Sequence, residues 1–313
     1  MNIYLDSNGR WRSGWRASIF LIALIFAVWP TGDIGRIINE AMAGHNSPGM
    51  IPLLIMFQAL SLFPSLLVGW LCGKALEGLP FRALGAAFTR SWLKNWLFGM
   101  GLGGATLCFA VLLGLVFGGL RFYVDPEQGG DMVATSLGMS FLFFAVASAA
   151  EEALFRGYFL QTFVRSGLAW PAILLTSIFF GLAHIGNPNT GPVAVLNTIL
   201  AGIWFGIAYL KTRDLWFVWG LHLMWNWMQG SLFGIEVSGV THISKAPLLK
   251  EVDHGPSWLT GENYGLEGGI VCTIALLVSM AVIYFLPWLK PNEEILALSE
   301  PTAVGSVAEL KET

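Results

Sequence analysis

Long apolar runs alternate with short polar connections along almost the whole chain. An α-helix needs roughly 20 residues to cross a hydrocarbon core of about 30 Å. Runs that approach this length cover residues 17–31, 51–73, 94–120, 135–160, 170–186, 192–210, 215–233 and 267–289. The pattern predicts an all-α fold, a polytopic bundle of about eight transmembrane helices.

The composition favours a membrane protein over a soluble one. Of 313 residues, 55% are hydrophobic and only 12% are charged, whereas soluble domains carry about 25% charged residues. The 37 glycines agree, because glycine lets neighbouring membrane helices approach closely. A net charge of −3 offers no basic field, so we expect no nucleic-acid partner. The three cysteines lie inside apolar runs without metal-ligand spacing, which predicts buried packing residues.

The distribution of Lys and Arg predicts the orientation of the helices. Cytoplasmic connections carry an excess of these residues. With the N-terminus in the cytoplasm, the inner side carries 13 of the 17 basic residues and the outer side carries 4. The inner set is Arg10, Arg12, Arg16, Lys74, Arg82, Arg90, Lys94, Arg156, Arg165, Lys211, Arg213, Lys290 and Lys311, and the outer set is Arg36, Arg121, Lys245 and Lys250. Both termini are therefore predicted to be cytoplasmic.

Three regions follow from the placement of polar residues. Residues 1–130 hold three N-terminal spans, and the first is expected to be an anchor helix because no small-residue cleavage site follows it. Residues 131–235 form a core whose spans contain ionisable groups. Residues 236–313 are expected to form an outer polar loop, the last transmembrane helix and a polar cytoplasmic tail.

Polar clusters interrupt three spans of the core. They are Glu151-Glu152-Ala-Leu-Phe-Arg156, Phe180-Gly-Leu-Ala-His184 and His222-Leu-Met-Trp-Asn226. Each charged group costs about 2.5–3.5 kcal/mol on membrane-insertion scales. At ~1.5 Å per residue from the inner helix ends, the polar groups lie roughly 12–21 Å from the cytoplasmic side. Polar groups from three helices at a similar depth indicate a site.

Helical spacing separates the two carboxylates of the first cluster. Glu152 and Arg156 are four residues apart, so they share a helix face and can pair. Glu151 points about 100° away from Glu152, which leaves it free to face a cavity. Taken alone, the Glu152–Arg156 pair is interpreted as structural and not catalytic, because pairing lowers the cost of burying both charges.

In each of the other two clusters, the first and the last residue are four positions apart. His222 and Asn226 share one helix face, and Phe180 and His184 share another, with Gly181 allowing a neighbouring helix to approach. A single buried histidine is usually a packing or hydrogen-bonding residue. The combination of two carboxylates, an arginine, two histidines and an asparagine favours a functional site over packing.

In this order, the motifs EExxxR, FxxxH and HxxxN resemble those of the CPBP family, which includes type II CAAX prenyl endopeptidases and bacteriocin-processing, Abi-like enzymes. The resemblance covers about residues 130–235. It implies an intramembrane protease in which Glu151 and His184 activate water and His222 and Asn226 stabilise the oxyanion. Glu152, Arg156 and Phe180 would support the site.

The residues of the three motifs do not decide whether the reaction needs a metal ion. Glu151, His184 and His222 would supply the two histidines and one carboxylate of a catalytic zinc site. No HExxH motif is present, and the resemblance favours a glutamate-dependent attack of water without metal. We therefore expect no cofactor, with zinc as the alternative.

The predicted function is endopeptidase cleavage of a membrane-associated protein or peptide. The expected location is the bacterial cytoplasmic membrane, with the lipid bilayer and a peptide substrate as partners and with the active-site chamber facing the cytoplasm. One alternative is a non-proteolytic scaffold or immunity-type protein of the same fold. Another is a proton-coupled transporter that uses Glu151 and Glu152, because intramembrane carboxylates also serve as proton relays.

Overall fold

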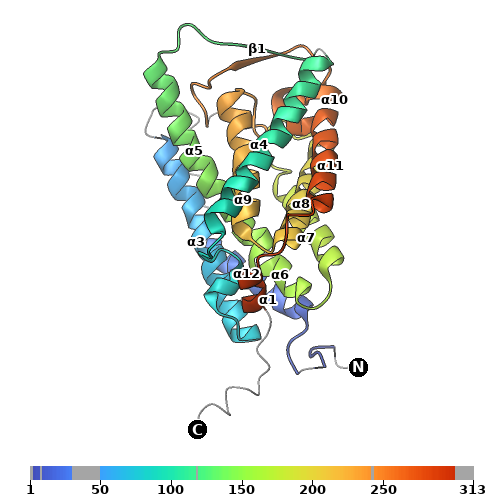
Figure 1. Cartoon of the computed structure of the whole chain (residues 1–313). Coiled ribbons are helices and arrows are strands. Elements are labelled where there is room, and N and C mark those ends of the chain that lie inside the picture. The colour runs from blue at the N-terminus through green and yellow to red at the C-terminus, as the bar shows by residue number, and fades with distance from the viewer. Residues whose placement is uncertain (1–2, 8, 30–49, 118, 241–242, 300–313) are drawn as a thin grey trace.

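The computed structural model describes residues 3–7, 9–29, 50–117, 119–240 and 243–299 as a bundle of helices (Figure 1). The long helices are α1 (Ser13–Val28), α3 (Met50–Glu77), α4 (Trp92–Val116), α5 (Gly130–Glu152), α7 (Ala169–Ala183), α8 (Pro192–Thr212), α9 (Leu215–Trp227) and α11 (Ile270–Phe285). The π-helical turn η2 (Ala153–Phe159) and α6 (Leu160–Val164) continue α5, and the π-helical turn η3 (Met228–Leu232) continues α9. Each predicted apolar run therefore contains a helix.

Helix length supports a membrane bundle. Within the described residues, 4 helices are long and apolar enough to cross a membrane, namely 51–77, 92–116, 130–164 and 192–212. Three shorter apolar helices are α1, α7 and α11. Large apolar side chains cover the outer helix faces, as at Phe63 and Phe285, which are 72% and 76% exposed. The number of spans and their orientation stay predictions.

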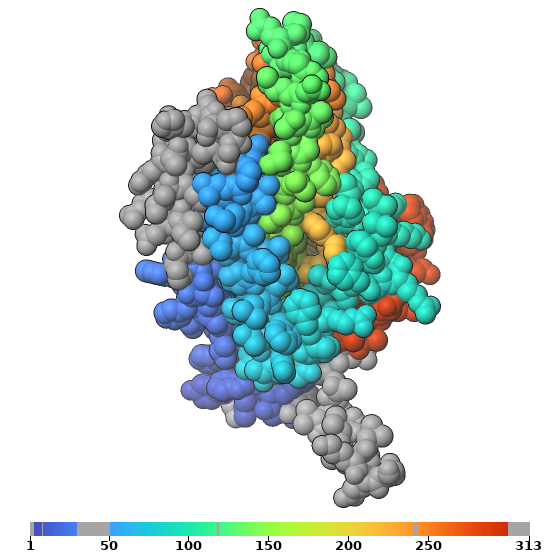
Figure 2. Space-filling model, turned by 90° about the vertical axis from the view of Figure 1, so that its left-hand side faces the viewer, coloured from blue at the N-terminus to red at the C-terminus, as the bar shows by residue number. Residues whose placement is uncertain are grey.

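Figure 2 shows α3 and α5 side by side along one flank of the bundle. The two ends of the bundle differ in structure. One end, here the α12 end, carries the start of α1 and the short helix α12 (Glu293–Ser299) (Figure 1). The other, here the β end, carries strands β1 (Leu120–Tyr123) and β2 (Lys250–Asp253), which pair antiparallel. The prediction of an all-α fold therefore needs a small correction, since β2 lies in the stretch expected to be an irregular polar loop.

The rest of that outer stretch is also ordered into short elements. Helix α10 (Ser257–Thr260) and the 3₁₀ turns η4 (Glu262–Tyr264) and η5 (Leu266–Gly268) lead into α11. A further 3₁₀ turn, η1 (Phe81–Leu84), lies at the α12 end between α3 and α4. Arg36, Lys311, residues 30–31 of the first predicted span and the tail from residue 300 lie outside the described residues.

Glycines bring α4 and α9 into backbone contact. A Cβ atom added to Gly99 or Gly103 would lie 2.1 or 2.2 Å from the carbonyl oxygen of Phe217 or Leu221. In return, a Cβ atom on Gly220 would lie 2.3 Å from the carbonyl oxygen of Trp96. This close approach is the small-residue packing typical of membrane helices, and it positions α9 within the bundle.

A buried ion cluster ties three helices together at the α12 end. Glu77 of α3 accepts from Arg16 of α1 at 2.5 Å and from Arg165, directly after α6, at 2.9 Å. Thr162 also donates to Glu77, at 2.9 Å. All three charged side chains are at most 9% exposed, so the pairing offsets the cost of burying them.

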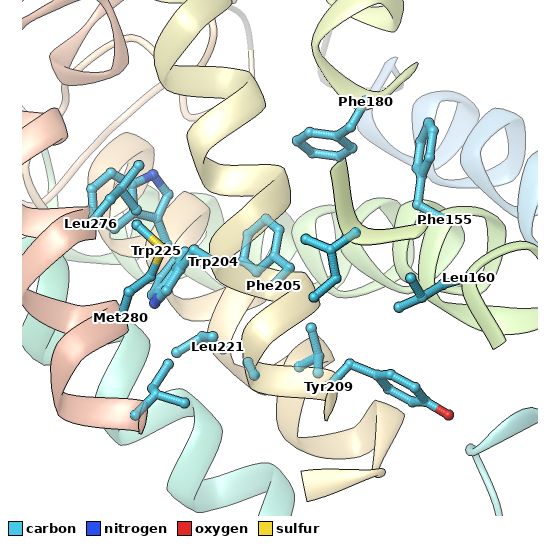
Figure 3. Packing of buried hydrophobic residues seen from close by; sticks show 14 of the residues in the cluster. Phe155, Leu160, Phe180, Trp204, Phe205, Tyr209, Leu221, Trp225, Leu276 and Met280 are labelled. Atoms are coloured by element: carbon cyan, nitrogen blue, oxygen red, sulfur yellow. The ribbon is translucent and has the colours of Figure 1, made fainter. Parts of the chain in front are cut away.

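A core of aromatic and aliphatic side chains fills the space among η2, α7, α8, α9 and α11 (Figure 3). Phe205 and Leu221 lie at its centre. Cys72 and Cys272 are buried, as expected, but Cys108 is exposed on the outside of α4. The expectation of three buried cysteines is wrong for Cys108, because apolar sequence alone does not distinguish a side chain that faces lipid from one that faces the core.

Candidate active site

The paired carboxylates lie where α5 changes into a π-helical turn. Glu151 and Glu152 are the last residues of α5, and η2 follows directly. Insertions of this kind are frequent at functional sites because they redirect side chains within a helix. Glu151 is 31% exposed and lines a cavity, whereas Glu152 is buried behind it. The predicted division between the two carboxylates is confirmed.

Both histidines of the motifs face Glu151. Its Oε2 atom lies 4.0 Å from Nε2 of His184 and 3.8 Å from Nε2 of His222. This oxygen is buried and has no hydrogen-bond partner in the part of the chain that the structure describes. Separations of this size exceed a direct hydrogen bond and suit a bridging water.

His184 lies at the end of a helix and not inside one. Helix α7 ends at Ala183, and His184 is its C-cap residue. Its Nδ1 atom lies 2.7 Å from the carbonyl oxygen of Phe180. Because a carbonyl only accepts, Nδ1 donates to it, and Nε2 is the ring nitrogen that faces Glu151. The fifth predicted span, residues 170–186, therefore extended the helix too far.

A buried chain of polar contacts holds His222. Its Nδ1 atom lies 2.8 Å from Oε1 of Glu152, and Nη1 of Arg156 lies 3.2 Å from the same oxygen. Arg156 also donates from Nη2 to the carbonyl oxygen of Gly202 at 3.0 Å. The predicted Glu152–Arg156 pair is confirmed, and the structure adds His222 to it.

Aromatic rings pack against this chain, and Figure 3 shows two of them, Phe180 and Phe205. The guanidinium carbon of Arg156 lies 4.7 Å from the ring centroid of Phe180 and 5.0 Å from that of Phe205. Phe205 also stacks on the imidazole of His222, with centroids 4.4 Å apart. Ring faces attract a cation, and more so where water is excluded. The supporting role of Phe180 stays a prediction, and Phe205 was not predicted.

The cavity beside Glu151 measures about 530 Å³. Glu151, Phe180, His184, His222 and Asn226 all line it, so three motifs on separate helices meet at one space. This volume is in the range of sites that hold small molecules or short peptide segments. Glu152 and Arg156 lie behind the wall. Gly181 allows the approach of α8 as predicted, because a Cβ atom there would lie 2.4 Å from Ile199.

Sequence reasoning missed a second carboxylate at the cavity. Glu267 accepts from Trp225 Nε1 at 3.1 Å and from the backbone nitrogen and Oγ of Ser238 at 2.6 and 2.7 Å. It thereby fixes the loop after η3 beside Asn226. Its only signal in the sequence is an ionisable residue at the first position of the eighth apolar run. Among the described residues that line the cavity there is no Lys or Arg, so its walls favour neutral or cationic groups.

Glu151, His184 and His222 are also the three candidate zinc ligands. Within the described ranges, no group of three or more His, Cys, Asp or Glu side chains is placed to hold a metal ion. The choice between attack by water without metal and a zinc site stays a prediction.

Part of the chain matches the model of a known protein family. Residues 133–228 match the family model described as type II CAAX prenyl endopeptidase, Rce1-like. The matched segment contains all three motifs, from Glu151 to Asn226, and confirms the resemblance that those motifs carry. The family is one of proteases, so the match supports a hydrolase, and the apolar helices support an integral membrane protein. No curated protein matches the chain.

Proposed function

We propose that this protein is an intramembrane endopeptidase that hydrolyses a peptide bond of a membrane-associated protein or peptide. Glu151 acts as the general base, and His184 helps to hold the attacking water. The observation that carries the proposal is the buried Oε2 atom of Glu151. It has no hydrogen-bond partner among the described residues, and it faces Nε2 of two histidines at 4.0 and 3.8 Å.

The proposed reaction begins with a water molecule between Glu151 and His184. Glu151 takes a proton from this water, and the oxygen attacks the carbonyl carbon of the substrate peptide. The carbonyl oxygen becomes an oxyanion. Collapse of this intermediate breaks the C–N bond, and the proton held by Glu151 passes to the leaving amine. A positioned acid–base group of this kind contributes about 10²–10⁴-fold to a rate.

The oxyanion needs hydrogen-bond donors. Asn226 donates from its side-chain amide. His222 donates from Nε2 when both ring nitrogens carry hydrogen, and its Nδ1 atom lies 2.8 Å from the carboxylate of Glu152. Fixed donors in a site that excludes water contribute about 3–4 kcal/mol each to transition-state stabilisation. Glu152 and Arg156 act as positioning residues because they hold His222 without lining the cavity.

The proposal is tested by comparing membrane fractions from cells that produce the wild type, Glu151→Ala or His184→Ala. Uncut precursors should accumulate in both variants at unchanged expression. Glu262→Gln removes an exposed carboxylate away from the site and serves as the control. Normal processing by both variants would overturn the proposal, and a full biological phenotype in both would favour the scaffold alternative. Activity that survives a chelator, in purified protein free of metal, would reject the zinc alternative.

A further inference from the structure

The cavity contains a carboxylate that the proposed reaction does not use. Glu267 lines the same cavity as Glu151 and belongs to η5, just before α11. It lies outside residues 133–228, the segment that the family model matches. In the described part of the chain no Lys or Arg lines the cavity, and none of the ion pairs there includes Glu267. The cavity therefore presents an acidic group that no described basic side chain balances.

Three hydrogen-bond donors hold the side chain of Glu267. Nε1 of Trp225 donates to Oε1 at 3.1 Å, and the backbone nitrogen and Oγ of Ser238 donate to Oε2 at 2.6 and 2.7 Å. A carboxylate has about four acceptor positions, so these contacts do not use all of them. Because Glu267 lines the cavity, the remaining position is available to a donor that enters it.

The backbone of Glu267 is also fixed. Asn197 of α8, which is 3% exposed, donates from Nδ2 to the carbonyl oxygens of Glu267 and Gly269, both at 2.9 Å. Thr273 of α11 in turn donates to Oδ1 of Asn197 at 2.6 Å. The carboxylate is thereby held in place before any ligand binds, and a preorganised group loses little conformational freedom on binding.

The contact with Trp225 places Glu267 close to the candidate active site. Trp225 belongs to α9 and lies between His222 and Asn226 in the sequence. Glu267 is therefore one hydrogen bond away from the part of α9 that carries two of the motif residues. Since Glu267 and Glu151 line one cavity of about 530 Å³, a peptide that reaches both carboxylates has its contact with Glu267 within a few residues of the bond at Glu151.

Two indole rings favour a long cationic side chain at this position. Trp204 and Trp225 both line the cavity, and their ring centroids are 5.8 Å apart (Figure 3). The alkyl stems of Lys and Arg pack on apolar surface while the charged heads reach a polar partner, and indole rings attract cations. A bare metal ion fits less well, because no described group of three His, Cys, Asp or Glu side chains is placed to hold one.

We propose that Glu267 is a specificity-determining residue of the cavity and that it binds a Lys or Arg side chain of the substrate peptide. That this peptide is also cleaved rests on the proposed function. The preference for a cationic side chain rests on Glu267, Trp225 and the absence of basic residues from the described cavity wall.

Peptide capture tests the preference without requiring activity. The probe is a library of short random peptides with acetylated N-termini, which removes the competing terminal amine. The protein is Glu151→Ala in phosphatidylcholine nanodiscs, whose lipid carries no net charge. This variant also lacks the other carboxylate that faces the cavity, so capture of cations is not due to Glu151.

We expect Glu151→Ala to enrich peptides that contain Lys or Arg by about tenfold or more, a gain typical of one hydrogen bond to a charged group. Adding Glu267→Gln should abolish the enrichment. Adding Ser238→Ala should preserve it, because the carboxylate and its other donors remain. Glu262→Gln, which removes an exposed carboxylate outside the cavity, should also preserve it.

No enrichment by Glu151→Ala would overturn the proposal, and this result needs no change at Glu267. Equal enrichment after Glu267→Gln would overturn it too. An equal loss in Ser238→Ala would assign the effect to the loop and not to the carboxylate, with the same consequence.

The same library, offered to the chain with its native Glu151, separates this proposal from the proposed function. Mass spectrometry identifies the cut peptides, and these should carry Lys or Arg at one fixed position relative to the cut bond. Glu267→Gln should remove that preference. Selective capture without cutting would reject the proposed function and support the binding role of Glu267. Cutting without any preference for Lys or Arg would overturn the role of Glu267 and support the proposed function.

Discussion

Nδ1 of His222 lies 2.8 Å from Oε1 of Glu152, although the two residues belong to different helices and are 70 positions apart. The same carboxylate oxygen accepts from Arg156 at 3.2 Å. His222 is thereby held with Nε2 toward the cavity, and its protonated form has an adjacent negative charge. This relationship explains why the first motif carries two adjacent glutamates, one for the cavity and one for the histidine.

Glu152→Gln should lower turnover by about 10²-fold or more, because the variant lacks the carboxylate oxygen that accepts from both His222 and Arg156. The measurement is the rate of cleavage of a precursor that accumulates in Glu151→Ala membranes. A variant that folds and keeps the wild-type rate would contradict the role assigned to Glu152.

Gly103→Val should destabilise the bundle, because any Cβ atom at this position meets the backbone of Leu221. Overpacking of this kind costs about 1–3 kcal/mol, and more when the obstacle is backbone. The midpoint of thermal unfolding in detergent measures the effect. Gly101→Val is the matched control, since a Cβ atom on Gly101 meets nothing within 4 Å. Equal melting temperatures for the two variants would contradict close packing of α4 on α9.

Glu77→Gln should destabilise the α12 end by about 3–5 kcal/mol, because it leaves the buried cations Arg16 and Arg165 without their shared partner. We expect the midpoint of thermal or denaturant unfolding to be lower for Glu77→Gln than for the wild type. Glu293→Gln provides the comparison, since Glu293 is exposed on α12. A similar stability for both variants would show that the cluster contributes little to holding α1 against α3 and α6.

The stability of the β end should depend on pH through Glu251. Burial, and then the charges of Glu236 and Asp253, raise the pKa of this carboxyl to about 8. An unfolded glutamate titrates near about 4.3, so the folded state binds the proton more tightly. The stabilisation that the protonated carboxyl of Glu251 gives the folded state is complete below about pH 4.3. It is lost as the pH rises through about 8.

Glu251→Gln removes this dependence. Its melting temperature in detergent should exceed that of the wild type at pH 9 and differ less at pH 5. His254 and Glu262 line the same surface hollow as Glu251, so Glu262→Gln controls for a general effect of removing charge there. If the melting temperature of the wild type rose between pH 5 and pH 9, compared with that of Glu251→Gln, the raised pKa would be contradicted.

Features that depend on residues close together in the sequence could be predicted well. Apolar runs became helices because a chain in an apolar environment must satisfy its backbone hydrogen bonds within each segment. The Glu152–Arg156 pair, and the position of Glu151 toward the cavity, followed from helical spacing, which is a local property. The exceptions are also local: α7 ends before His184, and a π-helical turn follows Glu152.

Contacts between distant segments could not be read from spacing. The hydrogen bond from His222 to Glu152, the stacking of Phe205 on His222 and the binding of Ser238 by Glu267 all depend on how separate helices pack. The amino-acid sequence determines which residues are polar within apolar helices and how basic residues are distributed, while the packed bundle determines which of the polar residues meet around one cavity.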